Sequence, residues 1–307
     1  MPATATGAGS IGQLHRKNLR LNDERAFSKA SCKLSAGAYR SESPYINHRS
    51  PPMVLRVVFV FAALAVLLYG GICLAMYLGQ RQQIYHPEAS WRVQQAPDFE
   101  LVNDGVRLRG WVVNPGRAKA LLYFGGNGER IEDSRQALSQ WFPDRTIYLL
   151  PYRSYGASEG KPSERALVGD AQALFDRVAR DHAAIAVVGR SLGSGVATQL
   201  AATRPVERLV LVTPFDSLVR VAAGYFSWLP VNALMQDRFE SWRYVNDIHC
   251  PVLVIRAEQD EIIPAERTLA LLKAFKQTPL VQVIADAGHN TVQDHADYRV
   301  SLERFLQ

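Results

Sequence analysis

Short apolar segments alternate with longer amphipathic segments along most of the chain. Six five-residue segments are largely apolar, at 120–124, 146–150, 184–188, 208–212, 251–255 and 280–284. Segments with helical periodicity lie between them, as over 163–180 and 194–203. Short apolar strands that alternate with helices are typical of a parallel sheet covered on both faces. The pattern therefore predicts an α/β fold over residues 80–307, with a mostly parallel sheet and helices on both faces.

Two regions depart from this alternation. F-E-L-V, the turn Asn103-Asp104-Gly105 and V-R-L-R-G-W-V-V together predict a β-hairpin before the first parallel strand. Residues 216–246 are rich in aromatic side chains and interrupt the strand–helix pattern. They form either a small cap over the site or a packed insertion, and the pattern favours neither.

A long apolar segment precedes the α/β pattern. Residues 57–78 contain no charged side chain, and 22 residues in a helix are long enough to cross the ~30 Å hydrocarbon core of a bilayer. A cleaved signal peptide has a shorter apolar region and a small-residue cleavage site, which this segment lacks. We expect an uncleaved single-pass anchor over 53–79, with Tyr69, Tyr77 and Tyr85 suited to the membrane interface.

The charge of the chain is concentrated ahead of this segment. Residues 1–52 hold eight Lys and Arg against three Asp and Glu, which is +5 of the total net charge of +6. We interpret them as a flexible basic tail; alternatively, translation starts at Met53. Because the Lys- and Arg-rich side of a membrane helix stays in the cytoplasm, we expect a cytoplasmic N-terminus and a C-terminal domain outside the cytoplasm. The charge difference that supports this orientation is much smaller if translation starts at Met53. The nearly neutral remainder does not indicate a nucleic-acid-binding face.

The sequence G-R-S-L-G, residues 189–193, directly follows a predicted strand and precedes a predicted helix. It matches the nucleophile elbow G-x-S-x-G, in which a strained serine is exposed at the end of a strand. The plain alternative is a tight turn in which the serine only begins the helix. A nucleophilic Ser191 needs a base to remove its proton.

His289 is the candidate base, because it follows the last strand in a glycine-containing loop at the same edge of the predicted sheet. Asp260, just past strand 251–255, is the candidate acid that orients His289, and the order Ser, Asp, His is that of α/β-hydrolases. Glu258, Glu261 and Asp286 compete with Asp260 for this role.

Acyl transfer also requires donors for the oxyanion. The backbone N–H of Leu192 is one candidate, and the second comes from G-G-N-G (125–128), where we choose the N–H of Asn127 with Gly126 as its neighbour. A phosphate-binding loop is not favoured, because no lysine follows at the required spacing. The three cysteines offer no four-ligand zinc site, and we expect neither a metal nor a cofactor.

Several blocks together resemble one known family. L-Y-F-G-G-N-G, Y-R-S-Y-G-A-S-E-G-K-P-S-E, G-R-S-L-G-S-G, T-P-F-D-S-L, and V-L-V-I-R-A-E-Q-D-E-I-I-P with G-H-N are similar to blocks of membrane-anchored α/β-hydrolase-domain proteins of the bud-emergence-like group. The resemblance covers roughly 80–305. Gly125 stands where that group usually has His, and Pro151 and Ser154 stand where it has Asp and Gly.

The resemblance implies a membrane-anchored serine hydrolase with Ser191, Asp260 and His289 as its triad. We expect cleavage of an acyl ester or thioester of a small or lipid-like molecule, with an apolar acyl group indicated by the aromatic residues of 216–246. Amide cleavage by a serine peptidase and a non-catalytic binding role on a hydrolase fold are the alternatives, since fold does not determine function.

Overall fold

A computed structural model describes residues 50 and 52–307, and residues 53–307 form one compact unit. Apart from residues 50 and 52, the predicted basic tail lies outside the described residues. Eight strands form one sheet: β1 (Phe99–Asn103), β2 (Val106–Val113), β3 (Lys119–Phe124), β4 (Arg145–Leu149), β5 (Ala184–Arg190), β6 (Leu209–Val212), β7 (Val252–Ala257) and β8 (Leu280–Ile284).

The strand order is β1-β2-β4-β3-β5-β6-β7-β8. Strand β2 pairs antiparallel with β1 and with β4. The remaining pairings, from β4 through β3, β5, β6 and β7 to β8, are all parallel. The predicted hairpin is confirmed as β1 and β2, with Asp104 and Gly105 both at positive φ, as a two-residue hairpin turn requires. The predicted α/β fold with a mostly parallel sheet is therefore confirmed.

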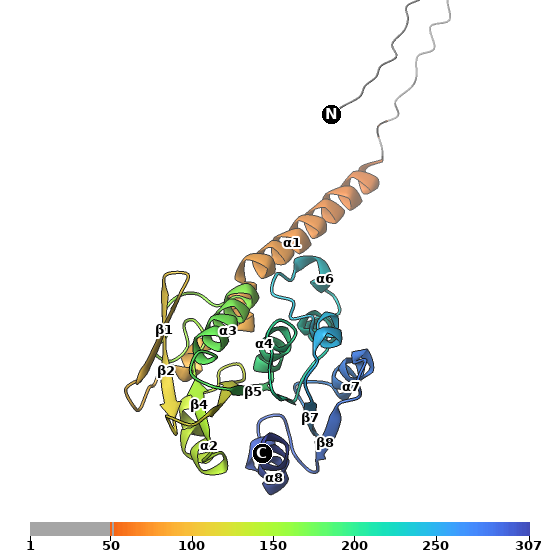
Figure 1. Cartoon of the computed structure of the whole chain (residues 1–307). Coiled ribbons are helices and arrows are strands. Elements are labelled where there is room, and N and C mark those ends of the chain that lie inside the picture. The colour runs from red at the N-terminus through yellow and green to blue at the C-terminus, as the bar shows by residue number, and fades with distance from the viewer. Residues whose placement is uncertain (1–49, 51) are drawn as a thin grey trace, which may run out of the picture. The chain divides into compact units, whose positions relative to one another are not determined.

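Helices cover both faces of this sheet (Figure 1). Their bounds are α1 (Met53–Ile84), α2 (Arg135–Trp141), α3 (Glu164–Val178), α4 (Leu192–Ala201), α5 (Leu218–Tyr225), α6 (Val231–Leu234), α7 (Ala265–Ala274) and α8 (Ala296–Leu306). Short 3-10 helices are η1 (Pro87–Ser90), η2 (Ile131–Ser134), η3 (Ser241–Arg243), η4 (Val245–Asp247) and η5 (Val292–Asp294).

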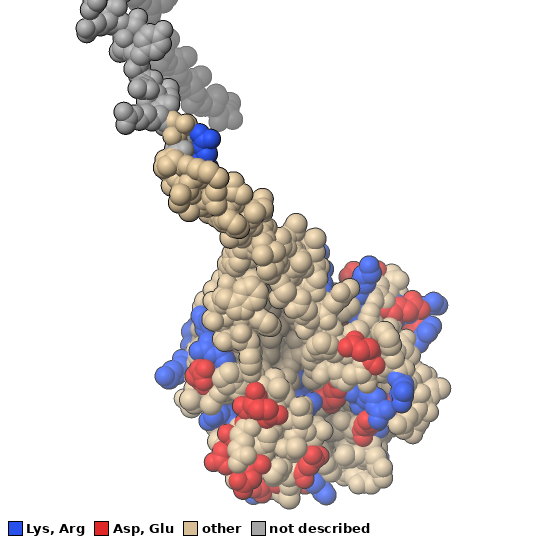
Figure 2. All heavy atoms as spheres, turned by 180° about the vertical axis from the view of Figure 1, so that it is seen from behind, with Lys and Arg blue, Asp and Glu red and all other residues tan. Residues whose placement is uncertain are grey.

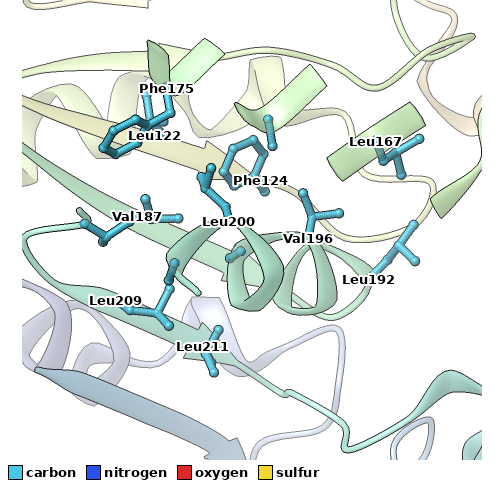
Figure 3. Packing of buried hydrophobic residues seen from close by; sticks show 14 of the residues in the cluster. Leu122, Phe124, Leu167, Phe175, Val187, Leu192, Val196, Leu200, Leu209 and Leu211 are labelled. Carbon is cyan, nitrogen blue, oxygen red and sulfur yellow. The ribbon is translucent and has the colours of Figure 1, made fainter. Parts of the chain in front are cut away.

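The two faces of the sheet carry separate apolar clusters, because successive strand residues point to opposite sides. Leu122 and Val187 pack with α3 and α4 on one face, whereas Leu121 and Val188 pack with α2 and α8 on the other. Figure 3 shows the side chains of α4 over neighbouring strands of the first face. Burial on both sides explains why these strands are apolar throughout instead of alternating.

Helix α3 illustrates how the sequence sets an element. Ser163 is its N-cap and its side chain accepts a hydrogen bond from the N–H of Ala166 at 3.2 Å. Leu167, Ala171 and Leu174 repeat at helical spacing and are buried against the sheet.

The apolar N-terminal segment forms the helix α1. By length and composition it is able to cross a membrane, with a mean hydropathy of 2.7 over its most apolar 18 residues and none of that window buried. The helix continues five residues past the predicted end of the anchor at 79. Residues 216–246 form α5, α6, η3 and η4, and α1 packs against them through Met76 and Cys73. We call the whole segment 216–246 the cap.

Candidate active site

Ser191 lies between β5 and α4, at the carboxyl end of a central strand. Its backbone has φ 50° and ψ −115°, a conformation that an L residue rarely adopts and that neighbouring structure must hold in place. Its N–H donates to the carbonyl of Val212 on β6 at 2.9 Å. The turn therefore has the strained backbone expected of a nucleophile elbow.

The glycines around Ser191 allow the strand and the helix to approach closely. A Cβ on Gly193 would collide with the carbonyl oxygen of Phe124 at the end of β3, and one on Gly189 would collide with Gly193 and with Ala197 of α4. Both positions therefore exclude a side chain for reasons of space, which accounts for the spacing of the two glycines about the serine.

His289 lies in the loop after β8, and its Nε2 is 2.9 Å from Ser191 Oγ. The residue is 4% exposed, and Arg190 Nη2 donates to its backbone carbonyl at 3.2 Å. With the proton on Nδ1, Nε2 is free to accept the hydroxyl proton of Ser191. The two residues are 98 positions apart in the sequence, and the fold brings them together at one edge of the sheet.

Asp260, in the loop after β7, meets the other side of the imidazole. His289 Nδ1 is 2.9 Å and 3.0 Å from its two carboxylate oxygens. The N–H groups of Ile262 and Ile263 donate to Oδ1 at 3.0 Å and 2.7 Å, which holds the carboxylate in place. A buried carboxylate with these donors is suited to stabilise a protonated imidazole.

The competing acids have other partners. Glu258 accepts a hydrogen bond from the N–H of Asp286, and Asp286 accepts one from the side chain of Gln259. Glu261 accepts the backbone N–H of His289 at 2.9 Å. This hydrogen bond lowers the pKa of the Glu261 carboxyl below its ordinary value, so Glu261 stays ionised and holds the histidine loop.

The predicted oxyanion donors do not all remain free. Leu192 is the first residue of α4, where the N–H has no partner within the helix. The N–H of Gly126 donates to Glu129 Oε2 at 2.6 Å, so Gly126 is not available to an oxyanion. Asn127, Ser191 and Leu192 line one cavity, which leaves Leu192 and Asn127 as the candidate pair.

The Y-R-S-Y-G block supports the loop that carries Asn127, a function that sequence reasoning missed. Tyr152 donates its hydroxyl to the carbonyl of Gly125 at 2.8 Å, and Tyr155 donates to Asn127 Oδ1 at 2.7 Å. Asn127 Nδ2 in turn donates to the carbonyl of Ile84 at the end of α1. The sequence signal that could have indicated this support is the pair of tyrosines separated by two residues in the block.

Two of the three departures from the family pattern, Gly125 and Ser154, have local explanations. A side chain at Gly125 would collide with Ile131, so this chain has no room there for the usual His. Ser154 replaces a Gly and has φ 70°, in the region that glycine favours, and its Oγ donates to the carbonyl of Gly160 at 2.6 Å.

A cavity of about 560 Å³ opens at Ser191. Its lining is mainly apolar and comes from the cap and the end of α1, including Val221, Leu229 and Met76. A serine with a base, an orienting acid, two candidate N–H donors and an apolar cavity is an arrangement that can carry out acyl transfer. Over residues 50 and 52–307, no cluster of three or more His, Cys, Asp or Glu is placed to hold a metal.

No family model matches the chain. It is 34% identical over 262 residues to the uncharacterized protein Rv2307c of Mycobacterium tuberculosis, covering 80% of this chain and 93% of that protein. It is 31% identical over 201 residues to the lysophosphatidylserine lipase ABHD12 of Danio rerio, covering 58% of this chain and 50% of that one. A 30% identical relative, over 53% of this chain and 60% of its own length, is the alpha/beta hydrolase domain-containing protein WAV2 of Arabidopsis thaliana.

Solved structures show the same fold. The esterase Pf2001 of Pyrococcus furiosus matches with a TM-score of 0.56 at 19% identity, covering 72% of this chain and 93% of that one. Est1E of Butyrivibrio proteoclasticus, solved with ferulic acid, matches with a TM-score of 0.55 at 18% identity, over 68% of this chain and 97% of that chain.

Proposed function

This chain belongs to the α/β-hydrolase family, and on that premise we propose that it is a membrane-anchored serine hydrolase that cleaves an acyl ester. The observation that carries the proposal is the chain of contacts from Ser191 Oγ through the imidazole of His289 to Asp260. The esterases and the lipase among its relatives and structural neighbours support hydrolase chemistry on an ester.

In the first half-reaction Ser191 Oγ attacks the acyl carbonyl while His289 Nε2 takes the hydroxyl proton. Asp260 accepts the Nδ1–H hydrogen bond and stabilises the imidazolium that forms. The N–H groups of Leu192 and Asn127 stabilise the negative oxygen of the tetrahedral intermediate. His289 then returns the proton to the leaving alcohol, and the acyl group remains on Ser191.

In the second half-reaction water attacks the acyl-enzyme. His289 removes one proton from the water, the tetrahedral intermediate forms again in the same oxyanion site, and the proton passes to Ser191 Oγ as the acid leaves. The enzyme is restored, and the net reaction is hydrolysis of one ester to an acid and an alcohol.

Labelling of the full-length protein with a fluorophosphonate probe tests this proposal. We expect labelling of the wild type and no labelling of Ser191→Ala. Ser194→Ala is the matched control and should still be labelled; the Ser194 hydroxyl donates a hydrogen bond to the backbone carbonyl of Ser191. Labelling that persists in Ser191→Ala, or folded wild type that is neither labelled nor active on nitrophenyl esters, contradicts it. Thioester and aminoacyl-amide substrates in the same panel distinguish an esterase from a thioesterase or a peptidase.

The membrane anchor is the second part of the proposal. Helix α1 supports it, because its first two-thirds present exposed apolar side chains such as Phe59, Leu67 and Leu68. We expect the protein to remain in the membrane fraction after alkaline carbonate extraction. A cytoplasmic N-terminus with the hydrolase domain outside remains a prediction, which protease protection of a tagged N-terminus in intact cells tests.

A further inference from the structure

The cavity at Ser191 ends at the membrane helix. Met76 and Ile84 of α1 line it together with Val221 and Leu229 of the cap. A volume of about 560 Å³ lies within the range of sites that bind small molecules. The end of α1 is therefore part of the wall of the candidate acyl site.

The cap reaches along the apolar part of α1. Tyr69 donates its hydroxyl to the backbone carbonyl of Trp228 at 2.9 Å, and Cys73 and Met76 pack against the cap. Tyr69 precedes the end of the uncharged run at Leu78 by nine residues, which is about 13 Å along a helix axis. The loop that holds Trp228 therefore lies beside a segment that we assign to the membrane or its interface.

A salt bridge holds the same two elements together where α1 leaves this region. Arg81 Nε and Nη2 donate to the carboxylate of Asp237 at 2.9 Å and 3.3 Å, and Tyr85 donates to the same carboxylate at 3.1 Å. Asp237 is buried. These contacts fix the position of α1 on the cap, so the wall formed by Met76 has a defined place.

Exposed aromatic side chains lie at and beside the cavity lining. Tyr225 and Phe226 line the cavity and are also exposed, and Trp228 beside them is 55% exposed. Figure 2 shows that the surface where α1 meets the rest of the molecule is largely free of Lys, Arg, Asp and Glu. Exposed aromatic rings on an uncharged surface beside a membrane helix are suited to the boundary between lipid and water.

We propose that the cavity opens into the bilayer and takes the acyl chain of an ester that resides in the membrane leaflet. The last turns of α1 then determine acyl-chain specificity as well as anchoring the protein, and the aromatic residues of the cap lie in the interface at the entrance. This inference rests on the proposed function of Ser191. By this inference, the anchor helix α1 forms part of the substrate-binding site.

The test compares two nitrophenyl esters with the full-length protein reconstituted in phosphatidylcholine vesicles. Nitrophenyl butyrate is supplied in solution, and nitrophenyl palmitate is incorporated in the vesicles. Met76→Trp fills the cavity at the α1 wall, and we expect it to lower the palmitate-to-butyrate ratio of kcat/KM at least tenfold. Leu74→Trp is the matched control, because Leu74 lies on the same helix, is 57% exposed and does not line the cavity; its ratio stays within twofold of the wild type.

A second pair of variants tests the entrance. Trp228→Asp puts a charge at the proposed interface, and we expect it to lower palmitate hydrolysis in vesicles at least fivefold more than butyrate hydrolysis. Val300→Asp is the control, since Val300 is an exposed apolar residue of α8, which lies away from α1 in Figure 1.

The outcomes separate this inference from the proposed function. Wild type that binds the fluorophosphonate probe and hydrolyses butyrate, together with an unchanged ratio in Met76→Trp and Trp228→Asp, overturns the inference and leaves the proposed function standing. Equal losses on both esters in these variants also overturn it. Wild type that neither binds the probe nor hydrolyses either ester overturns both.

Discussion

Arg190 and Glu129 form a buried ion pair next to the candidate triad, with Arg190 Nη1 2.9 Å from Glu129 Oε2. Their side chains are only 7% and 10% exposed. Glu129 also accepts hydrogen bonds from the hydroxyl of Tyr123 and the N–H of Gly126, while Arg190 donates to the carbonyl of His289. The pair thus connects the oxyanion loop, the elbow strand and the histidine loop.

Replacing Arg190 by Met leaves the Glu129 carboxylate buried without its cation. We expect the free energy of unfolding to fall by about 3–5 kcal/mol, as for other buried pairs that lose one partner. Urea unfolding followed by circular dichroism measures this change. Arg204→Met is the control, because its pair with Asp176 is more exposed and should contribute less than ~1 kcal/mol. Similar losses in both variants would show that Arg190 has no special structural role.

Asp260→Asn should lower kcat for a short-chain ester by about 10⁴-fold, because the amide favours the wrong tautomer of His289 and cannot stabilise the imidazolium. The control is Glu258→Gln, a change of the same kind two residues earlier, for which we expect kcat within twofold of the wild type. Initial rates on nitrophenyl butyrate measure both. A larger loss in Glu258→Gln than in Asp260→Asn would assign the role of the acid to Glu258.

Tyr155→Phe removes the hydroxyl that holds the Asn127 side chain, and we expect kcat to fall about tenfold while KM changes less than twofold. Tyr155 does not line the cavity, so it acts as a positioning residue through the oxyanion loop. Tyr148→Phe is the control, since its hydroxyl is 3.0 Å from His182 Nε2, before β5 at the opposite end of that strand from Ser191. A rise in KM with unchanged kcat would instead indicate a role in substrate binding.

Burial raises the pKa of the Cys250 thiol from its ordinary value near 9 to about 11. A thiol that ionises more easily in the unfolded chain favours unfolding once the pH exceeds its unfolded pKa. The contribution of Cys250 to stability is therefore present below pH 9 and is lost as the pH rises from about 9 to about 11. The difference in unfolding free energy between wild type and Cys250→Ala, measured at pH 8 and pH 10.5, should shrink at the higher pH. A constant difference contradicts the raised pKa.

Much of the fold could be predicted because its signals are local. Strands β3 to β8 are short apolar runs, and the hairpin turn has residues that tolerate positive φ at Asp104 and Gly105. Ser191, Asp260 and His289 could be proposed because each follows a predicted parallel strand, and the carboxyl ends of such strands share one edge. The sequence did not decide among Asp260, Glu258 and Glu261, because all three acids lie in one loop and only the path of the loop backbone determines which carboxylate faces the histidine.

The chain by itself determined which segments become strands and helices, and that a serine, an acid and a histidine reach one edge, because backbone periodicity and strand direction are properties of local sequence. Only the tertiary structure decided that the N–H of Gly126 is used by Glu129, that Tyr155 holds Asn127, and that Met76 of the apolar helix lines the cavity. These contacts join residues whose partners are chosen by packing and by the need to pair buried polar groups. Such choices depend on three-dimensional proximity, which periodicity does not specify.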